Sequence, residues 1–216
     1  MWIFSEKTQF CSMTKSELTF LFQQSLPGAF AHDTFAPYRK AFENQAASVR
    51  KKAAVGVHIY PHEGNWQFIL IERSAYDGKH SAQMAFPGGK PESSDLHLEH
   101  TARRESEEEL GIPSHLGENI AALSVVWIPV SSFEVSPFVF LHDERPHITK
   151  DDREVAQFYE VKLMDILLHE SISKTSIQVN EQVRMTDIPC FVLNEKIVWG
   201  ATALILAEIK YMLQSS

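Results

Sequence analysis

The sequence predicts an α/β fold, in which strands and helices of one chain pack as an α/β or α+β sandwich. Runs of β-forming residues begin at Ala53, and helical patterns stand before, between and after them. The length of 216 residues, 44% of them hydrophobic, fits one domain with or without an N-terminal extension and suffices to bury a full core.

The composition argues against several classes of function. A net charge of -8 argues against nucleic acid as a partner, because binding a phosphate backbone requires a basic face. The two cysteines, Cys11 and Cys190, form neither a CxxC pair nor a disulfide framework, which suits a reducing cytoplasm. The first ten residues lack the features of a signal peptide, and no apolar run reaches the length of a membrane span. We therefore expect a soluble cytoplasmic protein with no membrane partner.

The first 50 residues have helical patterns. Residues 14–17 form a capping box that opens the apolar stretch "ELTFLFQQSL", and Pro27 with Gly28 stops it. A weaker helical pattern covers residues 36–50. We expect residues 1–50 to be an N-terminal helical extension packed on a domain formed by residues 51–216.

The rest of the chain alternates between strand and helix patterns. Two β-rich runs, "AAVGVHIY" and "WQFILIER", flank a turn at residues 62–65 and predict a hairpin. Residues 95–110 are the strongest helix candidate, with Ser94 or Asp95 as the N-cap and Gly111 in the left-handed position after the end. The remaining predicted elements are strands at 121–130 and 136–143, a polar loop at 144–154, a strand at 155–161, a short helix at 162–170, a hairpin over 176–193 and a closing helix at 201–213.

Four carboxylates crowd the end of the mid-chain helix, in the stretch "RRESEEELGI". At about 100° per residue, Glu105, Glu108 and Glu109 share one helical face, while Glu107 points away. Each like-charge pair at this spacing costs about 0.2–0.5 kcal/mol, and the C-terminal end of the helix dipole also disfavours acids. A hard divalent cation such as Mg²⁺ or Mn²⁺ would reverse both penalties. A solvated acidic face remains the alternative for the cluster taken alone.

The residues around this cluster complete a longer pattern. The pattern begins within the glycine turn "FPGGK" and reads Gly89-x5-Asp95-x8-Arg104-Glu105-x2-Glu108-Glu109-x-Gly111-Ile112. This pattern resembles the Nudix box, the loop–helix–loop signature of the Nudix hydrolase superfamily. Three features depart from the usual box: Asp95 replaces a Glu, one extra residue precedes Arg104, and Ser106 stands at an apolar position.

The resemblance extends beyond the box, over residues 52–206. The segment "IERSAYDGKHSAQMAFPGGK" is similar to the one that precedes the box in the coenzyme A pyrophosphatase branch, and "VSPFVF", "REVAQFYEVKLMDIL" and "VWGATALIL" resemble later blocks of that branch. The branch usually has an arginine where Gly78 stands and a glycine where Ala82 stands.

The resemblance implies a fold and a set of metal ligands. The fold would be a Nudix-type α/β/α sandwich with a mixed β-sheet and the Nudix loop–helix–loop. Glu105, Glu108 and Glu109, with the Gly88 carbonyl, would hold Mg²⁺ or Mn²⁺ as the cofactor. Glu108 would accept the proton of the attacking water, and Glu154 resembles a later acidic residue that supplies a further ligand or base.

Basic residues near the box are the candidates for contacting substrate. Arg73, His80 and Lys90 supply the positive charge that an anionic diphosphate or a 3′-phosphate needs. Asp95 and Arg104 are instead expected to pair with each other and to brace the loop against the helix.

The implied function is metal-dependent hydrolysis of the diphosphate bond of coenzyme A or acyl-CoA, giving 3′-phospho-AMP and (acyl-)4′-phosphopantetheine. The expected partner is thus a small-molecule nucleoside diphosphate conjugate of the coenzyme A type. One alternative is a Nudix hydrolase acting on another conjugate, such as ADP-ribose or a nucleoside-diphosphate sugar. The other is a non-catalytic nucleotide-binding Nudix module, against which the complete acidic core argues. Residues 1–50 are assigned either to capping the domain or to a homodimer contact.

Overall fold

The computed structural model describes residues 13–36, 50–74, 83–129, 131–178 and 184–215, which form two β-sheets and several helices. The larger sheet contains β1 (Lys51–His62), β2 (Asn65–Arg73), β3 (Met84–Ala85), β4 (Gly88–Gly89), β5 (Glu118–Ala122), β6 (Val126–Ile128), β7 (Phe133–Leu141) and β8 (Val155–Lys162). The smaller sheet contains β9 (Ile172–Gln178), β10 (Arg184–Leu193) and β11 (Lys196–Val198). The helices are α2 (Lys15–Phe22), α3 (Ala29–Asp33), α4 (Leu98–Leu110) and α5 (Gly200–Gln214), with 3₁₀ turns η2 (Leu163–Leu167) and η3 (His169–Ser171).

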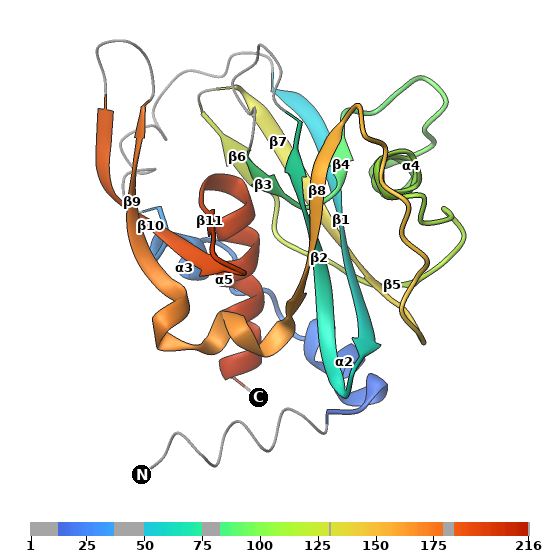
Figure 1. Cartoon of the computed structure of the whole chain (residues 1–216), viewed down its shortest axis with the longest axis horizontal. Coiled ribbons are helices and arrows are strands. Elements are labelled where there is room, and N and C mark those ends of the chain that lie inside the picture. Colours follow the sequence, from blue (N-terminus) through green and yellow to red (C-terminus); the bar gives the residue numbers. More distant parts are fainter. Residues whose placement is uncertain (1–12, 37–49, 75–82, 130, 179–183, 216) are drawn as a thin grey trace.

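The larger sheet lies between two helices and makes an α/β/α sandwich, with α4 on one face and α5 on the other (Figure 1). Its central strand order is β3-β2-β1-β7-β5, while β4 pairs with β1, β6 with β7 and β8 with β2. β1 and β7 run parallel, and the other neighbours run antiparallel, so the sheet is mixed. The predicted fold class, an α/β sandwich with a mixed sheet, is confirmed.

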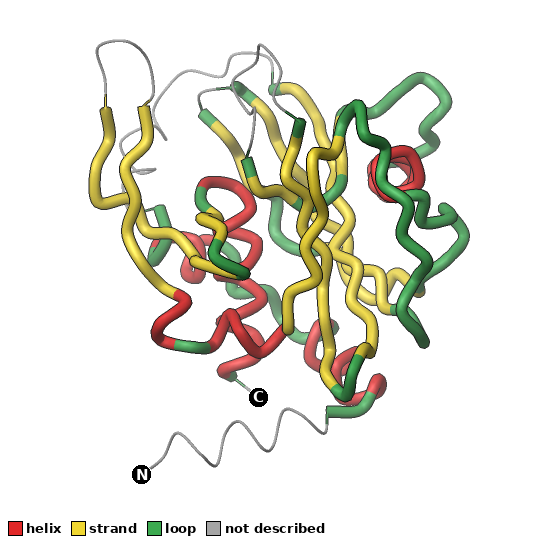
Figure 2. The backbone as a smooth tube through the Cα atoms, viewed as in Figure 1, coloured by secondary structure: helices red, strands yellow, loops and turns green. Residues whose placement is uncertain are grey.

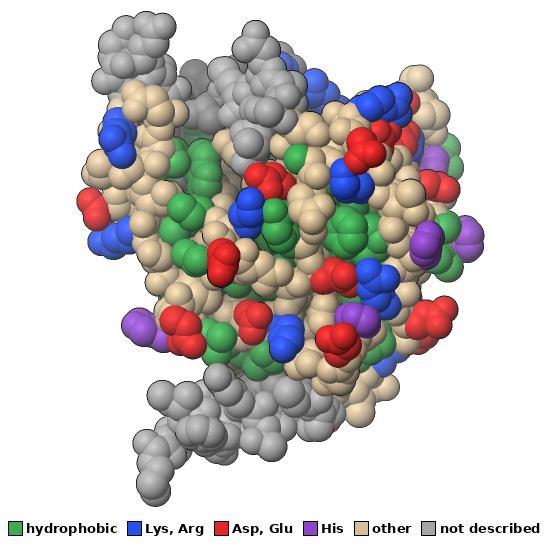
Figure 3. Space-filling model, viewed as in Figure 1, with side chains coloured by type: hydrophobic (Ala, Val, Ile, Leu, Met, Phe, Trp, Pro, Cys, Tyr) green, Lys and Arg blue, Asp and Glu red, His purple; other side chains and the backbone are tan. Residues whose placement is uncertain are grey.

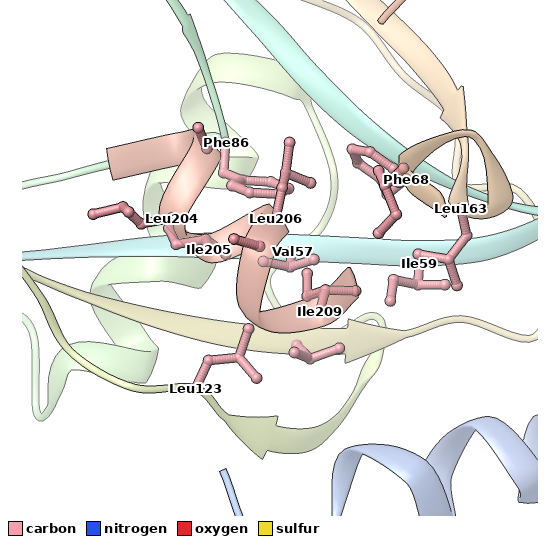
Figure 4. Close-up of a cluster of buried hydrophobic side chains, with 14 of the residues drawn as sticks. Val57, Ile59, Phe68, Phe86, Leu123, Leu163, Leu204, Ile205, Leu206 and Ile209 are labelled. Carbon is pink, nitrogen blue, oxygen red and sulfur yellow. The ribbon is translucent and has the colours of Figure 1, made fainter. Parts of the chain in front are cut away.

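Strand β1 contributes to both layers of the sandwich, because successive side chains of a strand point to opposite faces. Val57 and Ile59 belong to the main apolar cluster together with Ile209 of α5 (Figure 4). On the opposite face, Ala54 is buried against Ala102 of α4. These two alanines keep the separation between helix and sheet small, which places the end of α4 next to β4.

Several predicted elements are confirmed, and others differ. The strand predicted at 121–130 is divided into β5 and β6. β1 and β2 form the expected hairpin. The smaller sheet, which lies beside α5 (Figure 2), contains an antiparallel pair in the region of the second predicted hairpin. Its strands differ from the prediction, because residues 184–193 form the single strand β10, which pairs with β9 at 172–178. The predicted helix at 162–170 is wrong, because the chain forms the 3₁₀ turns η2 and η3 there. β11 was not predicted.

Helix α4 has a different start and the predicted end. Its N-cap is His97, whose Nδ1 accepts a backbone N–H of the first turn at 3.2 Å, so the prediction of Ser94 or Asp95 as the cap is wrong. The C-terminal prediction is confirmed, because Gly111 adopts the left-handed conformation with φ 66° and ψ 17°.

The described N-terminal residues pack on the sandwich. Thr14 and Glu17 form the predicted capping box at the start of α2, with Thr14 N–H donating to Glu17 at 2.7 Å. Leu18 and Phe22 are buried in the main apolar cluster. The helical pattern at 36–50 lies almost entirely outside the described residues. Within the described part of the chain, no helix combines the length and the apolar character that crossing a membrane requires.

Candidate active site

The acidic end of α4 lies against β4, with Glu109 as its most buried carboxylate. The side chain of Glu109 is 0% exposed. Its Oε1 accepts a hydrogen bond from Arg73 Nη1 at 3.0 Å, and its Oε2 accepts the Gly88 N–H at 2.8 Å. The same Arg73 nitrogen lies 3.3 Å from the Gly88 carbonyl oxygen. Glu109 is therefore tied to both β2 and β4.

Neighbouring carboxylates act on one another at this site. Burial raises the pKa of Glu109 to about 7 against the opposing effect of Arg73, and the charges of Glu105 and Glu154 raise it further. Burial also raises the pKa of Glu105, and the charges of Glu108 and Glu154 add to that rise. The charges of Glu105 and Glu109 are thus destabilised by their acidic neighbours, a cost that a bound cation would remove.

Gly89 makes room for the carboxylate of Glu105. A Cβ atom at position 89 would lie 2.4 Å from the Glu105 Cδ, so any side chain there would displace the carboxylate or the turn. The side chain of Glu105 is 13% exposed. The glycine turn identified in the sequence thus permits the close approach of β4 to the acidic face of α4.

Arg104 joins the loop before α4 to the acidic face, and its predicted pairing with Asp95 is confirmed. Its Nε and Nη2 both donate to Asp95 at 3.1 Å, and this pairing holds the pKa of Asp95 well below its usual range. Arg104 also donates to Glu108 and to Glu105, each at 3.0 Å. A further hydrogen bond reaches the Lys90 carbonyl at 2.9 Å. One guanidinium group therefore orders the loop and two of the carboxylates.

The loop between β7 and β8 brings Glu154 to the same site. The Thr149 N–H donates to the Leu110 carbonyl at 2.8 Å, and the Asp151 N–H donates to the Glu109 carbonyl at 3.0 Å. The loop thereby satisfies carbonyl groups that the end of α4 leaves without intrahelical partners. It ends at Glu154, which is exposed at the start of β8.

Glu107 and Glu108, the other two acidic residues near the end of α4, point in different directions. Glu107 accepts the backbone N–H of Ser114 at 3.2 Å, outside the site, as the helical spacing predicts. Glu108 has a side chain that is 54% exposed. On the face shown in Figure 3, acidic and basic side chains stand next to one another among the described residues.

The residues predicted to contact substrate differ in their surroundings. Arg73 is engaged in the ion pair with the buried acid of α4. Lys90 is exposed, with its Nζ 5.7 Å from the ring centroid of Phe133, and the Nζ of Lys51 lies 5.8 Å from the same centroid. Neither lysine forms an ion pair with a carboxylate in the described part of the chain. His80 lies outside the described residues.

The sequence did not point to Lys51 or Phe133 as neighbours of Lys90. The two residues face each other across the parallel ladder between β1 and β7. Parallel partners are far apart in the sequence, and neither residue belongs to a local motif. The only signal in the sequence was a cluster of basic residues at 50–52. This cluster does not indicate a position near Lys90 until the pairing of β1 with β7 is known.

The donor chemistry of the site fits a hard divalent cation. The groups are carboxylates and a backbone carbonyl, the oxygen ligands that Mg²⁺ and Mn²⁺ prefer. Within the described ranges, no group of three or more His, Cys, Asp or Glu side chains is gathered closely enough to hold a metal ion. The carboxylates of Glu105, Glu108 and Glu109 are turned instead toward the guanidinium groups of Arg104 and Arg73.

Comparison with known proteins gives consistent results. The family model described as the NUDIX domain matches residues 50–180. The chain is similar to the "Uncharacterized Nudix hydrolase NudL" of Pectobacterium atrosepticum, with 32% identity over 162 residues that cover 74% of this chain and 81% of the relative. The protein of the same description from Enterobacter sp. is 31% identical over 160 residues, with the same coverage. A solved MutT/nudix family protein from Enterococcus faecalis shares the fold, with a TM-score of 0.50 at 14% identity over 94% of this chain and 75% of that one.

Proposed function

This chain belongs to the Nudix hydrolase family, and on that basis we propose that it hydrolyses the diphosphate bond of coenzyme A or acyl-CoA. As a Nudix hydrolase it acts on nucleoside diphosphate derivatives. The proposed products are 3′-phospho-AMP and (acyl-)4′-phosphopantetheine. The choice of substrate is supported by the segment at residues 71–90, which is similar to the coenzyme A pyrophosphatase branch.

The observation that supports the proposal is that Glu105 and Glu109 lie beside the Gly88–Gly89 turn, within reach of the charge of Glu154. The three acids come from a helix and from a loop that docks on its end, and the charge of Glu154 contributes to raising the pKa of Glu105 and of Glu109. A fold that held them together for stability alone would gain nothing from this repulsion. The proximity of these charges supports a site for cations that neutralise a diphosphate.

Nudix hydrolases generally use divalent metal ions. We assign Glu105, Glu108, Glu109 and the Gly88 carbonyl as the groups that would hold Mg²⁺ or Mn²⁺. The ion would supply charge neutralisation at the diphosphate and a lowered pKa of water. Glu108, whose carboxylate is the most accessible of the three, is assigned to accept the proton of the attacking water. Glu154 is assigned as a further base or ligand.

Arg73, His80 and Lys90 remain the proposed substrate contacts. Arg73 also holds Glu109 and the Gly88 carbonyl in place. Lys90 and Lys51 offer two ammonium groups beside the Phe133 ring, a setting suited to a phosphate and an apolar group of the same ligand.

The Lys90→Ala variant tests this contact. We expect KM for the diphosphate substrate to rise about tenfold, since a hydrogen bond to a charged group contributes about 1.5–3 kcal/mol, while kcat changes little. The matched control is Lys162→Ala, an exposed lysine about 23 Å along β8 from Val155. Steady-state kinetics measures both constants, and an equal KM in the two variants would remove Lys90 from the binding site.

A substrate panel tests the proposed function most broadly. Coenzyme A, dephospho-coenzyme A, ADP-ribose and a nucleoside-diphosphate sugar are each incubated with the protein and Mg²⁺ or Mn²⁺, and the products are identified by mass spectrometry. We expect coenzyme A to be cleaved fastest and to give 3′-phospho-AMP.

The panel also separates the alternatives. Preferential cleavage of ADP-ribose or of the sugar conjugate would replace the coenzyme A assignment, and the departures at Gly78 and Ala82 favour that second candidate. Tight binding without turnover of any diphosphate would identify a non-catalytic nucleotide-binding module.

The remaining proposals concern the setting of the enzyme. We assign it to the cytoplasm, in keeping with Cys190, which is a buried free thiol. Residues 51–216 are proposed as the catalytic domain and residues 1–50 as an extension packed on it. A homodimer contact through that extension would be detected by light scattering of the full chain and of a chain that begins at Arg50.

A further inference from the structure

We propose that a buried chain of hydrogen bonds through His142, His58 and Ser106 holds α4 in the position that the active site requires. In this proposal His58 and Ser106 are positioning residues for hydrolysis. The inference rests on the proposed function, because it concerns the helix that carries Glu105 and Glu109. It goes beyond that function, since none of its three residues touches the diphosphate site.

The hydroxyl group of Ser106 determines the direction of every hydrogen bond in this buried series. Ser106 Oγ donates its single hydrogen to the Ala102 carbonyl at 2.7 Å. The contact of 2.8 Å with His58 Nε2 therefore requires that this nitrogen carry a hydrogen and donate it to Ser106. His58 Nδ1 is then an acceptor, and His142 Nε2 donates to it at 2.9 Å. The three side chains are 1%, 2% and 5% exposed for Ser106, His58 and His142, so water does not replace these bonds.

The chain of bonds reaches the catalytic helix at its acidic end. Ser106 follows Glu105 directly and precedes Glu109 by three residues. His58 lies in β1, on the face where Ala54 packs against α4. His142 directly follows β7, so the chain of bonds ties two central parallel strands to the helix.

Gly56 is a second and independent sign that this link is built into the fold. Gly56 and His58 are two residues apart in β1 and share the face toward α4. A Cβ atom at position 56 would lie 2.8 Å from both His58 Nε2 and Ser106 Oγ. Any side chain at position 56 would therefore break the bond between them. The serine stands at a position that the Nudix box usually fills with an apolar residue. This protein therefore has a directional hydrogen bond to His58 where the usual box has an apolar packing contact.

A directional hydrogen bond restrains the rotation and sliding of α4 more than an apolar contact does. The other α4 residues packed on the sheet, such as Ala102 and Leu110, tolerate small rotations and slides of the helix. A hydrogen bond of 2.8 Å weakens steeply with distance and angle, and so it resists both movements. Glu109 needs this restraint, because its carboxylate must meet Gly88 N–H at 2.8 Å and Arg73 at 3.0 Å at the same time.

The test uses Ser106→Ala, His58→Leu and the double variant that carries both changes. Ser106→Ala leaves a buried imidazole N–H without a partner, so we expect a lower midpoint of urea denaturation. We also expect kcat to fall about tenfold or more with KM little changed, since small misplacements of catalytic groups cost up to about 10²-fold. The concentration of Mn²⁺ at half-maximal rate should rise as well.

The double variant separates positioning from stability. The double variant removes the orphaned N–H beside α4, although His142 Nε2 then loses its acceptor at the less buried end of the hydrogen-bonded series. We therefore expect only part of the lost stability to return, while kcat stays low because the directional bond to α4 is still missing. Recovery of kcat together with stability in the double variant would overturn the proposal, as would a wild-type kcat in folded Ser106→Ala. If Ser106→Ala does not fold, the double variant decides alone.

Ser171→Ala is the matched control. Ser171 is also buried and also donates to a backbone carbonyl, that of Leu168 at 2.7 Å, but it lies in η3 and far along the chain from α4. This variant should lose stability and keep both kcat and the Mn²⁺ dependence. A loss of kcat in Ser171→Ala as large as in Ser106→Ala would show a general effect of destabilisation and overturn the proposal.

A metal-binding readout keeps this inference distinct from the proposed function. Mn²⁺ binding to each protein is titrated by electron paramagnetic resonance, which needs no substrate. If the substrate panel shows no turnover, the proposed function fails, and weaker Mn²⁺ binding by the double variant than by wild type still supports the positioning role. Equal Mn²⁺ affinity in wild type and double variant, or no Mn²⁺ binding by wild type, would overturn it.

Discussion

At the residue scale, Glu109 derives its chemistry from its surroundings. Burial raises its pKa to about 7, so near neutral pH this carboxyl group is partly protonated even with Arg73 beside it. A divalent cation competes with that proton, and binding of the cation is therefore expected to release it. The same burial that makes the charge costly makes the carboxylate a strong ligand once a cation is present.

Two buried histidines make the stability of the fold depend on pH. Burial lowers the pKa of His58 well below its ordinary value and that of His142 to about 4. Both stay neutral in the folded chain, while the unfolded chain binds protons below about pH 6.5. Their contribution is therefore fully present above about pH 6.5 and is lost as the pH falls toward 4. We expect the free energy of unfolding to fall more steeply over this window in wild type than in His142→Leu.

Urea denaturation of the two proteins at several pH values measures this difference. Glu109 acts in the opposite direction, because an acid with a raised pKa favours the folded state as the pH falls below 7. That effect is present in both proteins and cancels in the comparison. A stability difference between wild type and His142→Leu that does not change with pH would contradict the assignment of a neutral, buried His142.

Some residues of the site could be predicted and others could not. The spacing of Asp95 and Arg104 within a known box was sufficient to predict their pairing, since a motif fixes geometry. His58 carries no such signal, because a single histidine in an apolar strand is compatible with many environments. Ser106 was a visible departure from the box, yet its partner comes from a distant strand.

At the element scale, the end of α4 and the β7–β8 loop act as one unit. Gly111 has φ 66°, and a Cβ atom there would lie 3.1 Å from the Thr149 carbonyl oxygen. The Gly111→Ala variant should lose about 1–2 kcal/mol of stability through the left-handed conformation. It should also lower kcat, because moving Thr149 displaces the loop that carries Glu154.

Gly64→Ala is the control for this element. Gly64 has a similar φ of 74°, but a Cβ atom there has no neighbour within 4 Å among the described residues. Urea denaturation and steady-state kinetics should show a similar loss of stability in the two variants and a lower kcat in Gly111→Ala alone. Equal kcat in both would separate the loop from catalysis.

The elements differ in how well local sequence determines them. The β1–β2 hairpin follows from two β-rich runs around a turn, and α5 follows from a long apolar pattern. The predicted start of α4 was wrong because Asp95 is a residue type that favours the N-cap, whereas its carboxylate here accepts hydrogen bonds from Arg104. The 3₁₀ turns at 163–171 share the composition of a short helix, and packing decides between the two.

At the scale of the whole molecule, a buried acid of α5 anchors the N-terminal residues. Glu208 has a side chain that is 0% exposed, and it accepts hydrogen bonds from Ser124 Oγ at 2.6 Å and from the Gly28 N–H at 3.2 Å. We expect Glu208→Ala to lose about 2–3 kcal/mol of stability and to speed amide hydrogen exchange in α3. Mn²⁺ dependence should not change, because Glu208 and α4 lie on opposite faces of the sheet. Protection of α3 equal to wild type would refute the anchor, and exposed Glu170→Ala is the control.

The overall topology shows the limit of local patterns. Periodicity predicts strands and helices and hence an α/β sandwich. The parallel pairing of β1 with β7 is decided by contacts between distant segments, and it is this pairing that brings His142 to His58 and Lys51 to Phe133.

The most direct measurement compares wild type with Glu109→Gln in Mn²⁺ binding and in hydrolysis of the preferred diphosphate. Glutamine resembles the neutral acid that the folded chain already accommodates, so circular dichroism should show an intact fold. We predict weaker Mn²⁺ binding and a kcat lower by about 10²–10³, the loss that follows removal of one preorganised electrostatic group. A folded Glu109→Gln protein with wild-type Mn²⁺ affinity and turnover would contradict the claim that the acids of α4 bind the cations that drive hydrolysis.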